Sequence, residues 1–285
     1  MRALLQTVGK ALDHDVSILI LGESGSGKGY LAEAIHRSGG RRDEPFVQVD
    51  CAAIPPDLFE SELFGYEKGT FTGAETRRVG RLETAGRGTV YFDEIAALAP
   101  AVQAKLLRAV EERRFTRLGG GTTVRLEARV ISSSSADVEA ALRRDLLYRI
   151  NVLTVTLPPL RERREDIPAL AEEMAAAAGK RIALDAMELL ASHEWPGNVR
   201  ELRNAIERAA LLEDGDTITS ASLPLASPAQ IVTAASREGW TLEELESRYI
   251  REVLRRTKSN YSRAAEILGI NRKTLLEKRR KYGLE

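Results

Sequence analysis

Short apolar runs alternate with longer stretches of helical spacing through the first half of this 285-residue chain. Runs that are apolar throughout are typical of parallel strands covered by helices on both faces. The pattern therefore predicts an α/β fold built on a parallel sheet. The apolar runs stand at 16–21, 46–50, 89–93, 128–132 and 152–157, and helical spacing is found at 30–36 and 102–112.

Helical spacing alone continues after Pro158 and Pro159, which end the last apolar run. It covers 166–178, 185–192 and 198–212, and we expect Asn198 to be the N-cap of the third helix. The stretch that follows is rich in Ser, Ala, Thr and Pro, a composition typical of a linker. The expected organisation is an α/β subdomain at 1–158, a helical lid subdomain at 159–213, a linker at 214–239 and a small all-α domain at 240–285.

Basic residues gather at the C-terminal end, although the whole chain has a formal net charge of zero. From Arg248 to Glu285, twelve Lys and Arg stand against four acidic residues, a net of +8. Two predicted helices, 262–268 and 272–282, flank a turn at Gly269, as in a helix-turn-helix. A basic second helix favours DNA contact, and the alternative is a solvated helix face. The candidate DNA-binding residues are Arg272, Lys273, Thr274, Lys278 and Arg280.

The composition excludes several classes of protein. Cys51 is the only cysteine, so no internal disulfide is possible, and we expect a small buried residue there. The three histidines are scattered without metal-ligand spacing. The apolar run 16–21 is too short to span a bilayer, and charged residues precede it, so we expect a soluble cytoplasmic protein with no membrane contact.

The sequence GESGSGKG lies between a predicted strand and a predicted helix, which is the context of a phosphate-binding loop. Backbone N–H groups of such a loop surround phosphates, and its lysine reaches the terminal phosphates. The last residue of the motif is normally a serine or threonine that binds Mg²⁺. A glycine stands there in this chain, so the metal must depend more on other ligands. The candidate nucleotide-binding residues are Gly22, Glu23, Ser24, Gly25, Ser26, Gly27, Lys28 and Gly29.

Asp93 is the last residue of the apolar run TVYFD, and Glu94 follows it directly. Next to a phosphate-binding loop, Asp93 can lie near Mg²⁺ and Glu94 can polarise an attacking water. Two acids after a strand can also be solubilising surface charges. Their pairing with the loop favours hydrolysis of a nucleotide.

Three arginines could supply positive charge to a departing phosphate. Arg143 and Arg149 stand just before the strand at 152–157, and Arg200 stands at the start of a helix. In a single-subunit kinase such arginines act on the nucleotide of their own chain, whereas in a ring ATPase some act on a neighbour's nucleotide. The alternative is that they are surface arginines in helical ion pairs.

Several motifs together resemble the AAA+ domain of bacterial enhancer-binding proteins, the ATP-driven activators of sigma-54 RNA polymerase. This resemblance covers the chain from its first residues to about Glu213, and the last forty or so residues resemble the Fis-type helix-turn-helix of the same proteins. The motifs are GESGSGKG, ESELFGYEKGTFTGA, VYFDEI, QAKLLRAVEERRFTRLGG, RRDLLYRINV, LPPLRERREDIP and WPGNVRELRN.

The resemblance implies an ATPase that requires Mg²⁺ and assembles as a hexameric ring in the cytoplasm of a bacterium. Its implied partners are sigma-54 with RNA polymerase and enhancer DNA, with dimers formed through the helix at 242–256 and a palindromic DNA site. The implied roles are ATP binding for Lys28 and its loop, a Walker B pair for Asp93 and Glu94, arginine fingers for Arg143 and Arg149, and a lid nucleotide sensor for Arg200.

The segment GTFTGA sets an aromatic side chain among glycines and threonines. Taken by itself, Phe71 could lie against the core or be an exposed contact for a partner. The resemblance implies the second, because the segment corresponds to the loop with which the family contacts sigma-54. The candidate partner-binding residues are Gly69, Thr70, Phe71, Thr72, Gly73 and Ala74.

The chain departs from the family's pattern at four places. Gly29 replaces a glutamate, and Thr70 replaces an alanine. Asp50 replaces an asparagine that restrains the Walker B glutamate in many members. Ser134 and Ser135 stand where a Thr-Asn pair is usual on the strand that senses the γ-phosphate.

Two other functions remain open at this point. A metabolite kinase is disfavoured by the arginine-finger motif and the DNA module. A DNA-binding regulator that uses ATP as a ligand, with little turnover, would be favoured if the substituted strand at Ser134 and Ser135 prevented hydrolysis. Few residues precede the phosphate-binding loop, so regulation comes either from a separate protein or from a missing part of a longer one.

Overall fold

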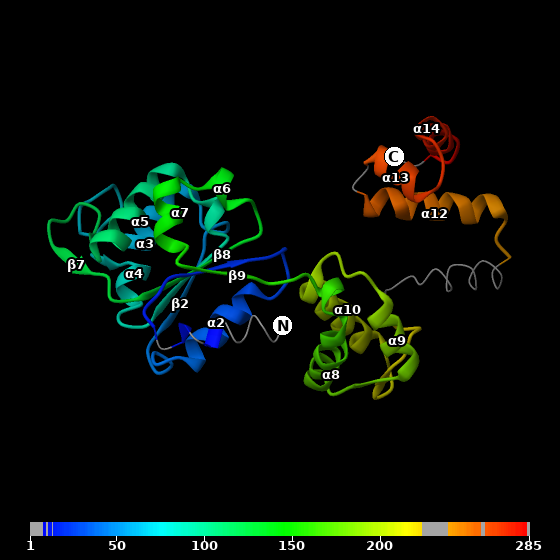
Figure 1. Cartoon of the computed structure of the whole chain (residues 1–285), viewed down its shortest axis with the longest axis horizontal. Helices are drawn as coiled ribbons and strands as arrows, with labels where there is room; N and C mark the ends of the chain where they lie inside the picture. The colour runs from blue at the N-terminus through cyan, green and yellow to red at the C-terminus, as the bar shows by residue number, and fades with distance from the viewer. Residues whose placement is uncertain (1–7, 10, 13, 224–238, 258–259, 284–285) are drawn as a thin grey trace. The chain divides into compact units, whose positions relative to one another are not determined.

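The computed structural model describes residues 8–9, 11–12, 14–223, 239–257 and 260–283 (Figure 1). The chain divides into two compact units, Met1–Leu223 and Pro224–Glu285. Each unit is described by itself. Among the described residues, no helix is long and apolar enough to cross a membrane.

A five-stranded sheet with the order β2-β5-β8-β1-β9 forms the centre of the first unit. Every pairing in it is parallel, which confirms the predicted α/β class. The order places β1, which leads into the phosphate-binding loop, beside β8, and β8 beside β5. The strands are β1 (Ile18–Leu21), β2 (Phe46–Asp50), β5 (Thr89–Asp93), β8 (Arg129–Ser134) and β9 (Leu153–Thr156).

Successive residues of each strand point to opposite faces, so the sheet has a hydrophobic core on both sides. Leu19 and Phe92 belong to one core, and Ile20 and Tyr91 belong to the other. Helix α2 covers one face, and α3, α5 and α7 cover the other (Figure 1). Cys51 is buried, as predicted. The helices of the α/β subdomain are α2 (Lys28–Ser38), α3 (Pro56–Phe64), α4 (Arg81–Thr84), α5 (Pro100–Glu112), α6 (Val138–Ala141) and α7 (Arg144–Ile150), with a short 3-10 helix at Ile95–Ala97.

Two short antiparallel hairpins lie outside the main sheet. Strands β3 (Gly65–Tyr66) and β4 (Arg78–Val79) flank the GTFTGA segment. Strands β6 (Arg114–Thr116) and β7 (Thr123–Arg125) form the second hairpin. A bridge between Tyr66 and Leu118 joins the two hairpins.

In the lid, Trp195 is fully buried and donates its indole N–H to the Leu190 carbonyl oxygen at 2.8 Å. The segment 214–223, predicted as linker, includes β11, which pairs with β10, and the buried Leu223, so ordered structure continues past residue 213. The lid elements are α8 (Ile167–Ala177), β10 (Arg181–Ile182), α9 (Leu184–Ser192), α10 (Asn198–Leu212) and β11 (Thr217–Ile218), preceded by 3-10 turns at Leu160–Glu162 and Arg164–Asp166.

Asn198 was predicted to cap α10, and this prediction was wrong. Gly197 is the N-cap, and no side chain caps the helix. Asn198 is the first helical residue, has φ 55° and is fully buried. Asparagine tolerates this left-handed conformation better than most residues. Its amide group is consequently free to bind residues far away in the sequence.

The second unit contains α12 (Leu242–Arg256), α13 (Tyr261–Ile267) and α14 (Arg272–Lys281). Asn260 and Asn271 cap the last two helices by accepting backbone N–H groups with their side chains. Gly269, with φ 65°, forms the turn between them, as predicted. The core of this unit contains Ile250, Val253 and Leu254 from α12 with Ala264, Ala265 and Leu275, and Leu268 and Ile270 pack against it.

Candidate functional site

The phosphate-binding loop joins the end of β1 to the start of α2. Gly25 has φ 76°, and a Cβ there would lie 2.4 Å from the Gly197 carbonyl oxygen, so only glycine allows this approach of the lid. Lys28 is 6% exposed, and its ammonium group points back into the loop. It donates to the carbonyl oxygens of Gly22 at 3.0 Å and Glu23 at 3.3 Å. The loop therefore surrounds its own lysine in this conformation.

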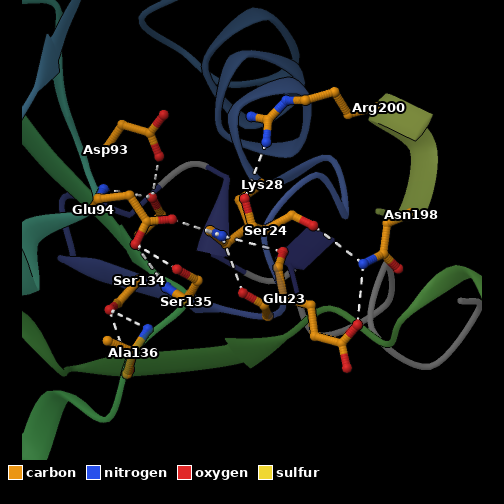
Figure 2. Close-up of polar contacts among 12 residues, drawn as sticks. Glu23, Ser24, Lys28, Asp93, Glu94, Ser134, Ser135, Ala136, Asn198 and Arg200 are labelled. Carbon is orange, nitrogen blue, oxygen red and sulfur yellow. Dashed lines mark hydrogen bonds and ion pairs between the residues drawn. The ribbon is translucent and has the colours of Figure 1, made fainter. Parts of the chain in front are cut away.

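Glu94 lies opposite Lys28, and the two side chains form an ion pair of 3.0 Å (Figure 2). Glu94 has φ 53° and ψ 52°, a left-handed conformation that a non-glycine residue keeps only where its surroundings hold it. Its second oxygen accepts the backbone N–H of Ser135 at 2.9 Å and the Ser135 hydroxyl at 2.8 Å. Burial acts to raise the pKa of Glu94, but the bonds from Ser135 and Lys28 leave it lowered.

Asp93 is held by two hydroxyl groups on one of its oxygens. Oδ1 accepts from the Ser133 hydroxyl at 2.6 Å and from the Tyr91 hydroxyl at 2.9 Å. Burial raises the pKa of Tyr91, so its hydroxyl stays protonated at neutral pH. In the part of the chain that the structure describes, no hydrogen bond or ion pair reaches Oδ2. One oxygen of Asp93 is therefore oriented and the other is open.

The serines at the end of β8 and directly after it alternate between two directions. Ser133 binds Asp93 and Ser135 binds Glu94. The Ser134 hydroxyl instead bonds to the backbone of Ala136 at 3.2 Å (Figure 2). Of the two serines singled out from the sequence, only Ser135 therefore faces the candidate site. Ser133 was missed, and the period of two along a strand was the signal that could have found it.

Asp50 does not contact Glu94. Its Oδ1 accepts the backbone N–H groups of Ala52 at 3.0 Å and Ala53 at 3.1 Å, so its carboxylate closes the turn after β2. An ionised carboxylate has no proton to donate to another carboxylate. In this chain the groups that hold Glu94 are Lys28 and Ser135.

The lid contacts the phosphate-binding loop through several charged and polar side chains. Arg161 forms two hydrogen bonds with the Glu23 carboxylate, at 2.6 and 2.8 Å, and these bonds, together with one from Asn198, lower the pKa of Glu23 to about 2. Arg163, buried, donates to the Ser26 carbonyl oxygen at 2.5 Å. These contacts link the loop to the lid.

Asn198 and Arg200 extend this link from the start of α10 (Figure 2). The Asn198 amide donates to Glu23 and to the Ser24 carbonyl oxygen, both at 3.1 Å. Arg200 donates to the Ser24 hydroxyl at 3.0 Å and so lies at the loop. Beside them lies a pocket of about 380 Å³, lined by Ser24, Pro196, Gly197, Arg200, Glu201 and Asn204.

The predicted finger residues Arg143 and Arg149 lie apart from this cluster. Arg143 precedes α7 and binds the Asp145 carboxylate at 2.8 and 3.1 Å, which raises the pKa of Arg143. Arg149, in the last turn of α7, is exposed. Within the described residues, no hydrogen bond or ion pair joins either guanidinium to the loop, Asp93 or Glu94. The structure therefore leaves both side chains at the surface.

The GTFTGA segment, Gly69 to Ala74, folds into a compact loop. The backbone N–H of Gly69 donates to the Ala74 carbonyl oxygen at 2.8 Å, and that of Ala74 donates to Phe71 at 3.0 Å. Thr72 and Gly73 are exposed, and Ala74 is buried. Phe71 is 46% exposed, and its ring meets Tyr66 edge-on with 4.9 Å between centroids. Phe71 is thus neither a core residue nor fully free.

The stem of this loop is fixed by Arg117, which is 7% exposed. Its guanidinium donates to Glu67 at 2.8 Å and to Glu83 at 2.7 and 2.8 Å. The Thr70 hydroxyl lies against the carbonyl oxygens of Glu67 at 2.6 Å and Leu118 at 3.0 Å. The substitution of threonine at position 70 therefore adds a contact between the loop and the second hairpin.

The candidate DNA-binding residues divide into two groups. Arg272, Lys273 and Arg280 are exposed on α14, as predicted. Lys278 was predicted to be available for DNA, but it forms an ion pair of 2.6 Å with Glu246, because α12 packs beside α14. The Thr274 hydroxyl donates to Asn271 at 3.0 Å as part of the helix cap. The basic surface of α14 is therefore smaller than the sequence indicates.

Comparison with known families resolves the chain's membership. The model of the Sigma-54 interaction domain matches residues 1–156, more than half of the chain. The chain belongs to the sigma-54-dependent transcriptional regulators. The models of the AAA+ ATPase lid domain and of the Fis family of bacterial regulatory proteins match residues 161–238 and 241–282.

Individual relatives of this family agree with that membership. The chain is 43% identical over 290 residues to the regulatory protein AtoC of Escherichia coli K12, covering 94% of this chain and 63% of AtoC. It is also 43% identical over 291 residues to the transcriptional regulatory protein ZraR of Salmonella typhimurium LT2, covering 98% of this chain and 66% of ZraR. The chain thus spans less than two thirds of these relatives' own length.

Solved structures show the same fold. NtrX from Brucella abortus in complex with ADP has a TM-score of 0.71 at 35% identity, covering 99% of this chain and 68% of that one. NtrX in complex with ATP has a TM-score of 0.69 at 36% identity, covering 99% and 67%. An Hsp104 structure, at 21% identity and a TM-score of 0.55, shares the fold over 69% of this chain.

The donor set around Asp93 fits a magnesium ion that is bound together with phosphates. Among the described residues, no three His, Cys, Asp or Glu side chains are grouped to hold a metal alone. Mg²⁺ commonly takes one or two carboxylates, waters and substrate phosphates. The open Oδ2 of Asp93 supplies such a carboxylate oxygen, and Gly29 supplies no hydroxyl.

Proposed function

We propose that this chain is an ATP-hydrolysing transcriptional activator that binds enhancer DNA and remodels sigma-54 RNA polymerase to open promoters. The observation that supports this most is the convergence of Lys28, Glu94, Asp93 and Arg200 on one loop at the carboxyl edge of the sheet. Family membership and the ATP- and ADP-bound NtrX structures agree with it.

The residues of the loop divide the chemistry among them. Lys28 leaves the carbonyl oxygen of Gly22 and the carboxylate of Glu94 to bind the terminal phosphates of ATP. Glu94 then has one oxygen free to accept a proton from water, while Ser135 continues to hold the other. Bound at Asp93, Mg²⁺ would neutralise charge on the phosphate oxygens. Arg200 moves from Ser24 to the nucleotide and carries the lid with it.

Hydrolysis requires a second subunit in this proposal, because Arg143 and Arg149 act on the neighbour's nucleotide in a ring, which we expect to be hexameric. Specific ATPase activity, measured as phosphate release, should therefore rise with protein concentration. Lys28→Ala is the matched control and should be inactive at every concentration. A parent whose specific activity is independent of concentration would contradict the ring.

A mixing experiment separates action on a neighbour from action within one chain. Arg149→Ala should lose hydrolysis and regain part of it when mixed with Lys28→Ala subunits, which keep an intact Arg149. The same result is expected for Arg143→Ala. If no mixture regains activity, neither arginine serves a neighbour's site.

The C-terminal unit is the proposed reader of enhancer DNA, and α14 is its recognition helix. Arg280→Ala should weaken binding because its side chain is exposed, whereas Lys278→Ala should have the smaller effect because Lys278 is already paired with Glu246. A double-stranded enhancer fragment selected from host DNA is the probe. Equal losses for both variants would contradict this division.

One observation favours a second function, a DNA-binding regulator that uses ATP as a ligand with little turnover. Both oxygens of Glu94 already have donors, Lys28 and Ser135. If nucleotide binding failed to release Glu94 from Lys28, no base would be free for hydrolysis. ATP binding without measurable turnover at any protein concentration would support this alternative.

A further inference from the structure

Two buried hydroxyl groups and the half-buried carboxylate of Asp93 form a cluster at the boundary of β5 and β8. The hydroxyl of Tyr91 lies 2.9 Å from both Asp93 Oδ1 and the hydroxyl of Ser133, and Ser133 lies 2.6 Å from the same Oδ1. Tyr91 and Ser133 are both fully buried. Neither side chain was a candidate from the sequence, and neither has a role in the function proposed above.

The protons of this cluster can be assigned from its geometry. The Ser133 hydroxyl has the shortest contact to Asp93 and donates there, so its lone pairs remain to accept from Tyr91 or from the backbone N–H of Glu94 at 3.3 Å. The Tyr91 hydroxyl has one proton, which it can donate either to Asp93 Oδ1 or to the Ser133 hydroxyl oxygen. All donors are therefore neutral, and they fix Asp93 without cancelling its charge.

The two hydroxyls also determine which oxygen of Asp93 is open. Both bind Oδ1, and within the described part of the chain no other hydrogen bond or ion pair reaches the carboxylate group. Oδ2 is consequently the oxygen available to a cation. Hydrogen bonds of this kind orient a carboxylate ligand and hold its free oxygen in place for the metal.

Gly29 is the second, independent observation. A Cβ at this position would lie 3.7 Å from Tyr91 Cε1 and 3.8 Å from the Tyr91 hydroxyl oxygen. A serine or threonine at this place in a phosphate-binding loop would project its hydroxyl from that Cβ. The chain therefore lacks the loop hydroxyl and has a tyrosine hydroxyl within 4 Å of the atom that would carry it.

We propose that Tyr91, together with Ser133, orients Asp93 toward the magnesium ion of the nucleotide and compensates for the missing hydroxyl at Gly29. Tyr91 is a positioning residue in this view, since it acts through Asp93. The inference rests on the proposed function, because it requires that Mg²⁺ and a nucleotide bind at this loop.

The test uses Tyr91→Phe in the full chain, which removes one oxygen and keeps the buried ring. The probe is the non-hydrolysable analogue AMP-PNP, titrated by calorimetry in EDTA and at a series of Mg²⁺ concentrations. We expect unchanged affinity in EDTA and a Mg²⁺ requirement raised about tenfold, the lower end of the usual effect of such second partners. Ser133→Ala carries the same expectation and serves if Tyr91→Phe fails to fold.

Two further variants make the test specific. Tyr30→Phe removes a hydroxyl from a tyrosine that is 77% exposed on α2, and it should leave the Mg²⁺ requirement unchanged. Adding Gly29→Ser to Tyr91→Phe returns a hydroxyl to the loop and should recover most of the lost Mg²⁺ affinity. Contacts of 3.7–3.8 Å around this position leave room for the serine Cβ.

The outcomes separate this inference from the proposed function. A parent in which Mg²⁺ strengthens AMP-PNP binding, and a Tyr91→Phe variant with the same Mg²⁺ requirement, would overturn the inference alone. Equal weakening of Tyr91→Phe in EDTA and in Mg²⁺ would also overturn it, because that is the effect of a purely structural residue. A parent that binds no AMP-PNP would overturn the proposed function and this inference with it.

Discussion

Replacing Phe71 by alanine tests whether the tip of the GTFTGA loop belongs to the core or contacts a partner. Removing a fully buried phenylalanine costs about 3–5 kcal/mol of unfolding free energy. Phe71 is 46% exposed, so its burial contributes only about half of the 1.5–3 kcal/mol that a fully buried side chain contributes. Its edge-on pair with Tyr66 contributes about 0.5–1.5 kcal/mol, part of which is the same buried area. We therefore expect Phe71→Ala to cost about 1–2 kcal/mol.

Phe64, the last residue of α3, provides a matched control. Phe64 is 3% exposed in the core and pairs with Phe115 at 5.9 Å between ring centroids. Phe64→Ala should cost about 3–5 kcal/mol and reduce every activity together. For a unit of this size, Phe71→Ala should lower the Tm by about 2–8 °C.

The decisive assays are thermal unfolding, ATP hydrolysis, binding to purified sigma-54 with ATP or a transition-state mimic, and promoter opening. Phe71→Ala should hydrolyse ATP and bind enhancer DNA like the parent, yet fail to bind sigma-54 and to open the promoter. Full sigma-54 binding and transcription would refute the assignment of Phe71 as a partner contact. A loss of stability as large as that of Phe64→Ala, with loss of ATPase activity, would refute the exposed loop tip.

Three further predictions concern the loop, its link to the lid and the DNA unit. Glu94→Gln should bind ATP but not hydrolyse it, because an amide cannot accept a proton from water, and near-normal phosphate release would contradict that role. The pKa of Glu23 is lowered from 4.5 to about 2, so the ion pair stabilises the fold fully above pH 4.5, and this stabilisation is lost as the pH falls toward 2. In urea unfolding, Arg161→Ala should therefore destabilise the protein more at about pH 7 than at about pH 3. A destabilisation that is independent of pH would exclude the ion pair as its cause. Deleting 240–285 should abolish enhancer binding and spare ATPase activity, and binding by the full chain should weaken with salt at a log–log slope of about −0.9 per phosphate contacted, so binding that ignores salt would contradict the phosphate contacts.

The sheet and the loop could be predicted because their signals are local. Each of the five parallel strands is a short apolar run, and the spacing GESGSGKG is itself the chemical signal of the phosphate-binding loop. Asp93 and Glu94 end one of those strands, and parallel strands bring their carboxyl ends to one edge. The position of these acids near Lys28 therefore followed from the predicted fold.

The errors all concern contacts between residues distant in sequence. Asn198 fits an N-cap by position, but its amide binds Glu23 and Ser24 instead. The ion pair of Lys278 with Glu246 was likewise missed, because Glu246 is on another helix. The role of Tyr91 beside Gly29 depends on how β5 packs against α2, which no local pattern encodes.

The buried Arg117 has a mechanical consequence for the GTFTGA loop. Glu67 and Glu83 flank the loop, and separating either carboxylate from the guanidinium would break charge-assisted hydrogen bonds worth about 1.5–3 kcal/mol each. The segment that can rise while this support stays intact runs from Gly69 to Gly73. These two glycines have φ values of 81° and 102°, and no atom lies within 4 Å of where their Cβ atoms would be. Lifting it breaks backbone hydrogen bonds and the contact of the Thr70 hydroxyl with the Leu118 carbonyl oxygen, each worth about 0.5–1.5 kcal/mol. Arg117 thus confines movement of the loop to its tip between Gly69 and Gly73 and keeps its base folded.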